Sequence, residues 1–223
     1  MILSLVVVQG GLAPRPAYAQ VGTIYYVDKD RPDDSGDGLS WATAKRNLQS
    51  ALALATAGAQ IWVADGTYYP DEGTGQTNNN RDATFSLKDG VAIYGGFAGT
   101  ETLLTERDVA ANVAILSGDL DQSGTATNND AYHVVTSDGN ATTALLDGFT
   151  ITGGNANGSN PQDRGGGIYT FNSSQAQFAA LTISGNDAIF GSGVFNDSSS
   201  PSYTNVTISG NTAFDDGGGV YND

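Results

Sequence analysis

Three short segments near the C-terminus are almost identical: GGGIY at 165–169, GSGVF at 191–195 and GGGVY at 217–221. Their starting positions are equally spaced along the chain. A second segment lies between them, as LTISGN at 181–186 and VTISGN at 206–211, with a looser earlier copy, FTITGGN, at 149–155. A period of about 26 residues repeated in register is typical of a solenoid in which each repeat forms one coil.

Both segments alternate apolar and polar side chains, which is the pattern of a strand with one buried face. Leu181 and Ile183 are expected to point inward, and Thr182 and Ser184 outward. One short strand buries little surface, but strands stacked one period apart form parallel ladders over a continuous core. The sequence therefore predicts an all-β fold, a right-handed parallel β-helix with two strands in each coil.

Stacking also predicts which side chains meet. Residues one period apart should form an aliphatic column, an aromatic column beside it and two columns of amides. The expected columns are Ile168, Val194 and Val220; Tyr169, Phe195 and Tyr221; Asn186 and Asn211; and Asn196 and Asn222. These asparagines are therefore interpreted as structural residues rather than ligands.

The repeat becomes looser toward the N-terminus. Strand-like runs recur near residues 61, 91, 113 and 133, separated by Gly, Asn and Asp. Coils are therefore predicted over residues 61–223, about six of them at such a period. Because the chain stops inside a coil, the β-helix is expected to be truncated at its C-terminus.

Residues 20–60 are predicted to cap the first coil. A short capping helix is expected over 43–57, where Leu48, Ala51, Leu52 and Ala55 form a narrow apolar stripe. Ser40 or Thr43 is the expected N-cap, and Gly58 the stop.

Residues 1–19 have the pattern of a signal peptide. The apolar run Ile2–Val8 is followed by Ala17-Tyr18-Ala19, a small-x-small cleavage pattern, although no Lys or Arg precedes the run. The alternative is a buried first strand. Export predicts an extracellular or cell-surface location, with membrane attachment only through a missing C-terminal anchor.

Composition limits the partners. The chain of 223 residues carries a formal net charge of −15, which repels nucleic-acid phosphates and anionic lipid headgroups. It contains no cysteine, so it has neither disulfides nor thiolate metal ligands. Cations, glycans and surface proteins of host or neighbouring cells remain as partners.

Several stretches resemble known bacterial families. Segments 26–30 (YVDKD), 61–68 (IWVADGTY) and 94–97 (YGGF) resemble the opening of surface proteins with pectin-lyase-like β-helices. The glycine-rich repeats and 200–211 are similar to polymorphic outer-membrane protein repeats, with glycine at 167, 193 and 219 where that signature has alanine. The resemblance implies a secreted or outer-membrane protein used in adhesion or envelope structure.

The β-helix fold also carries polysaccharide lyases and hydrolases, so the residues must decide the function. A lyase needs a basic residue beside its Ca²⁺ site, but no Lys or Arg lies in the coils from Gly165 onward. Asp215-Asp216 is interpreted as a turn, and the single histidine, His133, as a packing or surface residue of a strand. A non-catalytic binding role is favoured, with a polysaccharide lyase or glycoside hydrolase as the alternative.

The clearest chemical pattern is the segment 119–130. Compared with the Ca²⁺ loop of an EF-hand, Asp119, Asp121 and Ser123 fall at the first, third and fifth positions, and Gly124 at the sixth. Thr125 follows at the seventh position and Asp130 is the last. Asp119, Asp121, Ser123, Thr125 and Asp130 are therefore predicted to bind Ca²⁺, and the alternative is a solvated acidic loop. Asp28, Asp30, Asp33, Asp34 and Asp37 form a second acidic cluster with weaker spacing.

Overall fold

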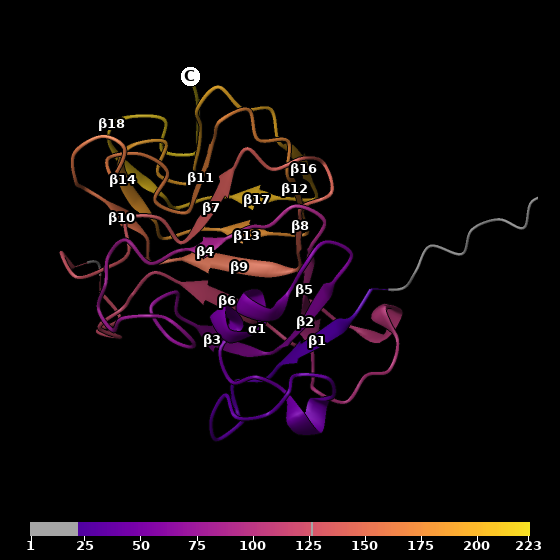
Figure 1. Ribbon diagram of the computed structural model, residues 1–223. Coiled ribbons are helices and arrows are strands. Elements are labelled where there is room, and N and C mark those ends of the chain that lie inside the picture. The colour runs from indigo at the N-terminus through magenta and orange to yellow at the C-terminus, as the bar shows by residue number, and fades with distance from the viewer. Residues whose placement is uncertain (1–21, 126) are drawn as a thin grey trace, which may run out of the picture.

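In a computed structural model the chain forms an all-β parallel β-helix (Figure 1). The structure describes residues 22–125 and 127–223, so the predicted signal peptide lies outside the described residues. Within this part, four parallel sheets run along the helix axis, and this axis leads from the indigo N-terminal end to the yellow C-terminal end. The predicted fold class is confirmed.

The first two sheets have a strand in every coil that follows residue 60. The first contains β1 (Ile24–Val27), β2 (Gln60–Ala64), β5 (Ala92–Phe97), β8 (Leu145–Asp147), β12 (Gln177–Ala179) and β16 (Ser202–Thr204). The second contains β3 (Gly66–Tyr68), β6 (Ala114–Ser117), β9 (Phe149–Thr152), β13 (Thr182–Ile183) and β17 (Thr207–Ile208).

The other two sheets complete the circuit of each coil. The third contains β4 (Phe85–Ser86), β7 (Val135–Asp138), β11 (Ile168–Phe171), β15 (Val194–Asn196) and β19 (Val220–Asn222). The fourth is shorter, with β10 (Asn155–Ala156), β14 (Asp187–Phe190) and β18 (Thr212–Asp216).

Each of the last coils contributes one strand to every sheet, so the predicted two strands per coil is wrong. The chain passes through β12, β13, β14 and β15 before β16 returns to the first sheet. The two extra strands escaped detection because their sequences repeat only loosely. β12 reads QFA where β16 reads SYT, and β14 reads DAIF where β18 reads TAFDD.

Coil length varies more than the C-terminal repeat suggests. Gln177 pairs with Ser202 in the next coil, whereas Ala92 pairs with Leu145, which is about twice as far along the chain. Loops 98–113, which contains the 3₁₀-helix η2 (Leu104–Glu106), and 118–134 lengthen that second coil. Within the described residues five coils therefore follow residue 60, fewer than the six predicted.

The predicted columns are confirmed. Ile168 pairs with Val194, and Val194 with Val220, in register. The Phe195 ring centroid lies 5.9 Å from that of Tyr169 and 5.0 Å from that of Tyr221.

The amides stack as predicted too. Asn186 Nδ2 donates to Asn211 Oδ1 at 2.9 Å, and Asn196 Nδ2 to Asn222 Oδ1 at 2.7 Å. Asn186 is fully buried, and its Oδ1 accepts a hydrogen bond from Gly154 N at 3.0 Å. The amide column thus satisfies buried backbone groups that no strand partner reaches.

The N-terminal helix is shorter than predicted. α1 (Leu48–Leu54) begins later because Lys45 is in extended backbone and its N donates to Tyr26 O at 2.9 Å. The Ser40 side chain instead caps the 3₁₀-helix η1 (Trp41–Thr43). The apolar stripe is confirmed, because Leu48, Ala51, Leu52 and Ala55 join the core, where α1 packs against β1 and β2 (Figure 1).

Replacing the buried amide should destabilise the fold. Asn186→Ala leaves Gly154 N without its partner and removes the side-chain hydrogen bond to Asn211 Oδ1, which should cost about 2 kcal/mol of unfolding free energy. Thr182→Ala is the control, because this side chain is exposed and should cost less than about 0.5 kcal/mol. Urea denaturation measures both variants, and equal losses would contradict a structural role for the amide column.

Candidate metal site

The acidic segment 119–130 lies in the long loop between β6 and β7, at the place that the fourth sheet occupies in later coils. Asn155, the first residue of β10, donates its backbone N–H to Ala131 O at 2.8 Å. Its side chain donates to Thr127 O at 2.8 Å. The loop therefore covers the otherwise open edge of β10.

Three of the predicted ligands converge in this loop. One carboxylate oxygen from each of Asp119, Asp121 and Asp130 lies within 4.8 Å of the other two. Asp130 is buried, Asp119 is half-buried and Asp121 is exposed, so the group extends from the β-helix wall to solvent. Carboxylate oxygens at such separations suit a hard cation such as Ca²⁺.

Backbone amides hold each carboxylate in place. Gly124 N donates to Asp119 Oδ2 at 2.8 Å, Ser123 N to Asp121 Oδ1 at 3.1 Å and Thr127 N to Asp130 Oδ2 at 2.7 Å. The turn that aims these amides inward needs a positive φ of 74° at Gly124, a conformation that glycine adopts without strain. The glycine predicted at the sixth position therefore has a structural reason.

The two hydroxyl residues lie differently. Ser123 Oγ donates to Thr125 O at 3.1 Å, so its hydroxyl contacts Thr125. Thr125 lines a cavity of about 360 Å³ together with Asp119, Asp130 and Thr152. The structure thus brings Asp119, Asp121 and Asp130 together and places Thr125 beside them.

The pKa values of Asp121 and Asp130 are shifted in opposite directions. Hydrogen bonds from Asn129 and Ser123 lower the pKa of Asp121 to about 2. Burial raises the pKa of Asp130, and the charges of Asp119 and Asp121 raise it further. A bound cation would relieve this repulsion between carboxylates and favour the ionised form of Asp130.

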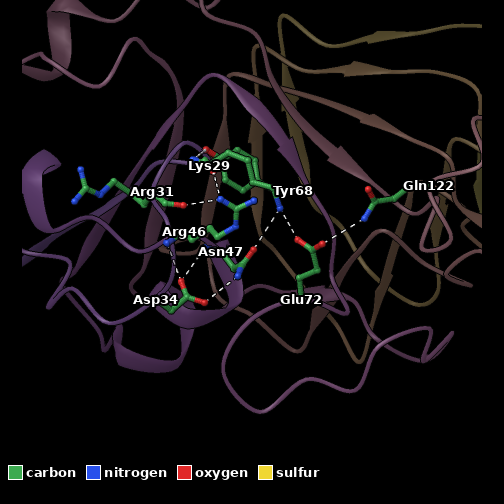
Figure 2. Close-up of polar contacts among 8 residues, drawn as sticks. All are labelled: Lys29, Arg31, Asp34, Arg46, Asn47, Tyr68, Glu72 and Gln122. Carbon is green, nitrogen blue, oxygen red and sulfur yellow. Dashed lines mark hydrogen bonds and ion pairs between the residues drawn. The ribbon is translucent and has the colours of Figure 1, made fainter.

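The second acidic cluster is structural. Asp34 accepts hydrogen bonds from Arg46 N at 2.7 Å and Asn47 N at 2.9 Å (Figure 2). Asp28, Asp33 and Asp37 each accept the backbone N–H of the residue two positions later. Among the described residues, Asp119, Asp121 and Asp130 form the metal-type cluster, and these N-terminal aspartates do not.

The basic groups near the loop have structural roles. Arg81 donates to Asp130 O at 2.6 Å and Asn155 O at 2.9 Å, and its guanidinium lies 4.0 Å from the Tyr132 ring centroid. His133 Nδ1 lies 3.2 Å from Gly165 O, and burial of its ring lowers its pKa. Sequence reasoning missed the role of Arg81, because the residues that it joins are distant in the chain.

Arg164 was also missed. Although it precedes the repeats, its guanidinium packs 4.9 Å from the Phe195 ring centroid, and its NH1 lies 3.7 Å from carboxylate oxygens of both Asp197 and Asp223. The sequence did contain a signal, because Asp197 and Asp223 directly follow Asn196 and Asn222, which pair in register.

The fold and this loop define a parallel β-helix protein with an acidic lateral site. A family model described as "Protein of unknown function (DUF1565)" matches residues 33–223, and the chain belongs to this family. Neither the curated proteins nor the solved structures contain a match. Among the described residues, none of the helices has the combination of length and apolar character needed to cross a membrane.

His133 should make stability depend on pH. Because its folded pKa is lowered, the unfolded chain binds more protons below its ordinary pKa of about 6.5, and stability should fall as pH drops through that value. Urea midpoints measured on either side of that pH should show the loss. His133→Gln should remove this component, and an unchanged decline in that variant would contradict the assignment.

Proposed function

We propose that this chain is the coil region of a secreted or cell-surface bacterial β-helix protein of the pectin-lyase-like type, resembling polymorphic outer-membrane protein repeats. Its role is to bind glycans or surface proteins of other cells without catalysis, and its 119–130 loop binds Ca²⁺. The observation that carries the proposal is the convergence of three carboxylates whose basic neighbour, Arg81, is committed to main-chain oxygens.

The commitment of Arg81 argues against acid–base chemistry at this loop. A lyase site would need a basic side chain free to accept a proton from the substrate. Arg81 donates to Asp130 O, Asn155 O and Asn157 Oδ1, and it stacks on Tyr132. Its role is to fix the loop to the coils, which leaves cation binding as the chemistry of the carboxylates.

Calcium would strengthen the wall of the β-helix. The loop already lies on β10 through Asn155, and Asn157 Nδ2 donates to Asn128 Oδ1 at 2.8 Å. A cation held by Asp119, Asp121 and Asp130 would tie the exposed part of the loop to buried Asp130. The result is a rigid lateral surface, which a binding protein outside the cell needs because ordering on binding lowers affinity.

The outer surface offers polar columns for contact. Thr182 is in register with Thr150 and Thr207 on the second sheet, and Thr182 and Thr207 are exposed. Hydroxyls at strand spacing can hydrogen-bond repeating polar partners such as neutral glycans. The net charge of −15 disfavours anionic ones.

One observation favours the enzymatic alternative. Asp197 and Asp223 come from consecutive coils, and both approach Arg164, while Tyr169 OH donates to Asp197 Oδ2 at 3.0 Å. Carboxylates close together on a surface are the requirement of a glycoside hydrolase. Depolymerisation of polygalacturonate with Ca²⁺ present, followed by unsaturated or reducing product, would replace the binding role with this one.

Calcium titration tests the metal site. Isothermal calorimetry on the whole chain should give one site with a dissociation constant of about 10⁻⁴ to 10⁻³ M, the range of extracellular modules. Asp121→Asn and Asp130→Asn should each weaken it at least about tenfold. Asp215→Asn is the matched control and should bind like the parent chain; Asp215 and Asp216 are exposed residues of strand β18, so the turn predicted for them is wrong.

Calcium should also stabilise the fold. At a free concentration of 100 times the dissociation constant, binding to the folded state should contribute about 2.7 kcal/mol and raise the melting temperature. A chelator should reverse the shift, and Asp121→Asn, which binds at least about tenfold more weakly, should reduce it to about half or less. An equal shift in Asp121→Asn and the parent chain would place the stabilising ion elsewhere.

A further inference from the structure

The side chain of Lys29 lies between an amide and a carboxylate at the N-terminal end of the β-helix. Its Nζ forms an ion pair with Glu72 Oε2 and donates to Asn47 Oδ1 at 3.4 Å (Figure 2). These residues come from three elements: Lys29 follows β1, Asn47 is the N-cap of α1, and Glu72 follows β3. An amine that contacts both a carboxamide and a carboxylate has the groups needed to form an amide bond between side chains.

Asn47 is oriented with its oxygen toward the lysine. Its Nδ2 donates to Asp34 Oδ2 at 2.9 Å, so Oδ1 is the atom that turns toward Lys29 (Figure 2). The carbonyl carbon lies one bond of about 1.23 Å beyond that oxygen. Because Nζ contacts Oδ1, which is bonded to Cγ, the amine lies beside the carbonyl group that it would attack.

Both the backbone and the side-chain stem of Lys29 are held in place. Its backbone N donates to Tyr68 OH at 3.2 Å, and Tyr68 OH donates to Ala64 O at 2.9 Å. The stem packs against Gly66, where an added Cβ would lie 3.0 Å from Lys29 Cβ. The amine is therefore delivered to one place, and such positioning can supply much of the barrier reduction for an intramolecular reaction.

Glu72 is positioned in the same way. Its Oε1 accepts a hydrogen bond from Gln122 Nε2 at 3.3 Å, which leaves Oε2 for Lys29 (Figure 2). The following residue, Gly73, packs closely against Asn47, because a Cβ added at Gly73 would lie 3.0 Å from Asn47 Cβ. The Lys29 and Glu72 side chains are only 18% and 28% exposed, so water is partly excluded from the cluster.

We propose that Lys29 and Asn47 form an intramolecular isopeptide bond, with Glu72 as the group that transfers the proton. Glu72 takes a proton from the Lys29 ammonium, and the freed Nζ lone pair attacks Asn47 Cγ. The new Nζ–Cγ bond forms and the Cγ–Nδ2 bond breaks. Glu72 returns its proton to Nδ2, which leaves as ammonia. The ammonia takes the second proton that the Lys29 amine loses and becomes ammonium, so the new amide nitrogen keeps one proton.

The bond would staple the N-terminal cap. It joins the end of β1 to the start of α1 and closes a segment of 18 residues. The chain has no cysteine, so disulfides cannot supply such a cross-link. Because it needs no oxidant and no cofactor, the reaction depends on folding alone.

Mass spectrometry of the whole purified chain tests the proposal. The intact mass should be lower than the sequence mass by one ammonia, about 17 Da. A tryptic digest should give one branched peptide containing both Lys29 and Asn47, without cleavage after Lys29. Full mass with both residues in linear peptides after prolonged incubation of the folded chain overturns the proposal, as does ammonia loss located in any other peptide.

Variants separate the chemistry from folding. Lys29→Arg keeps the positive charge opposite Glu72 but should abolish the mass loss, and Glu72→Gln should slow it by at least about a hundredfold. Lys88→Arg, a lysine that binds main-chain oxygens of α1 and its C-cap, is the matched control and should retain the bond. Circular dichroism confirms that each variant is folded, and persistence of the branched peptide in Lys29→Arg would contradict the assignment.

Discussion

In-register pairing of parallel strands one coil apart is the constraint on which the rest of the structure depends. A coil of about 26 residues is too small to bury its own apolar side chains, so each coil is stable only against its neighbours. Register fixes which side chains stack: Ile151, Ile183 and Ile208 line the core, while Thr150, Thr182 and Thr207 face outward. A slip of one residue would exchange these two sets.

The proposed functional side chains lie in loops, because in-register pairing with both neighbouring strands tightly constrains the length and conformation of the strands. Long insertions such as 98–113 and 118–134 enter at coil corners, where the entropy cost of a longer loop grows slowly. The acidic loop attaches to β10 through Asn155 and reaches Glu72 through Gln122. The proposed calcium site and the Lys29 cluster are therefore neighbours, both placed by a rigid scaffold.

The sequence alone predicted those features of the structure that follow from the spacing of residues along the chain. The C-terminal columns, the amide ladder at Asn186 and the apolar stripe of α1 follow from spacing, and all are confirmed. The four-strand coil was not predicted, because outward residues of the first and fourth sheets are free to vary. The convergence of Asp119, Asp121 and Asp130 was foreseen from local spacing, whereas Arg81, Arg164 and the Lys29 cluster join distant segments that no local pattern links.

A paired-cysteine experiment tests the stacking register most directly, since the native chain contains no cysteine. Thr182 and Thr207 are outward partners on β13 and β17, and strands about 4.8 Å apart place them within disulfide range. Thr182→Cys with Thr207→Cys should cross-link quantitatively under mild oxidation. Thr182→Cys with Ser209→Cys, offset along the strand by two residues, should not. Equal cross-linking of both pairs, or linkage of the offset pair alone, would contradict the register and the β-helix built on it.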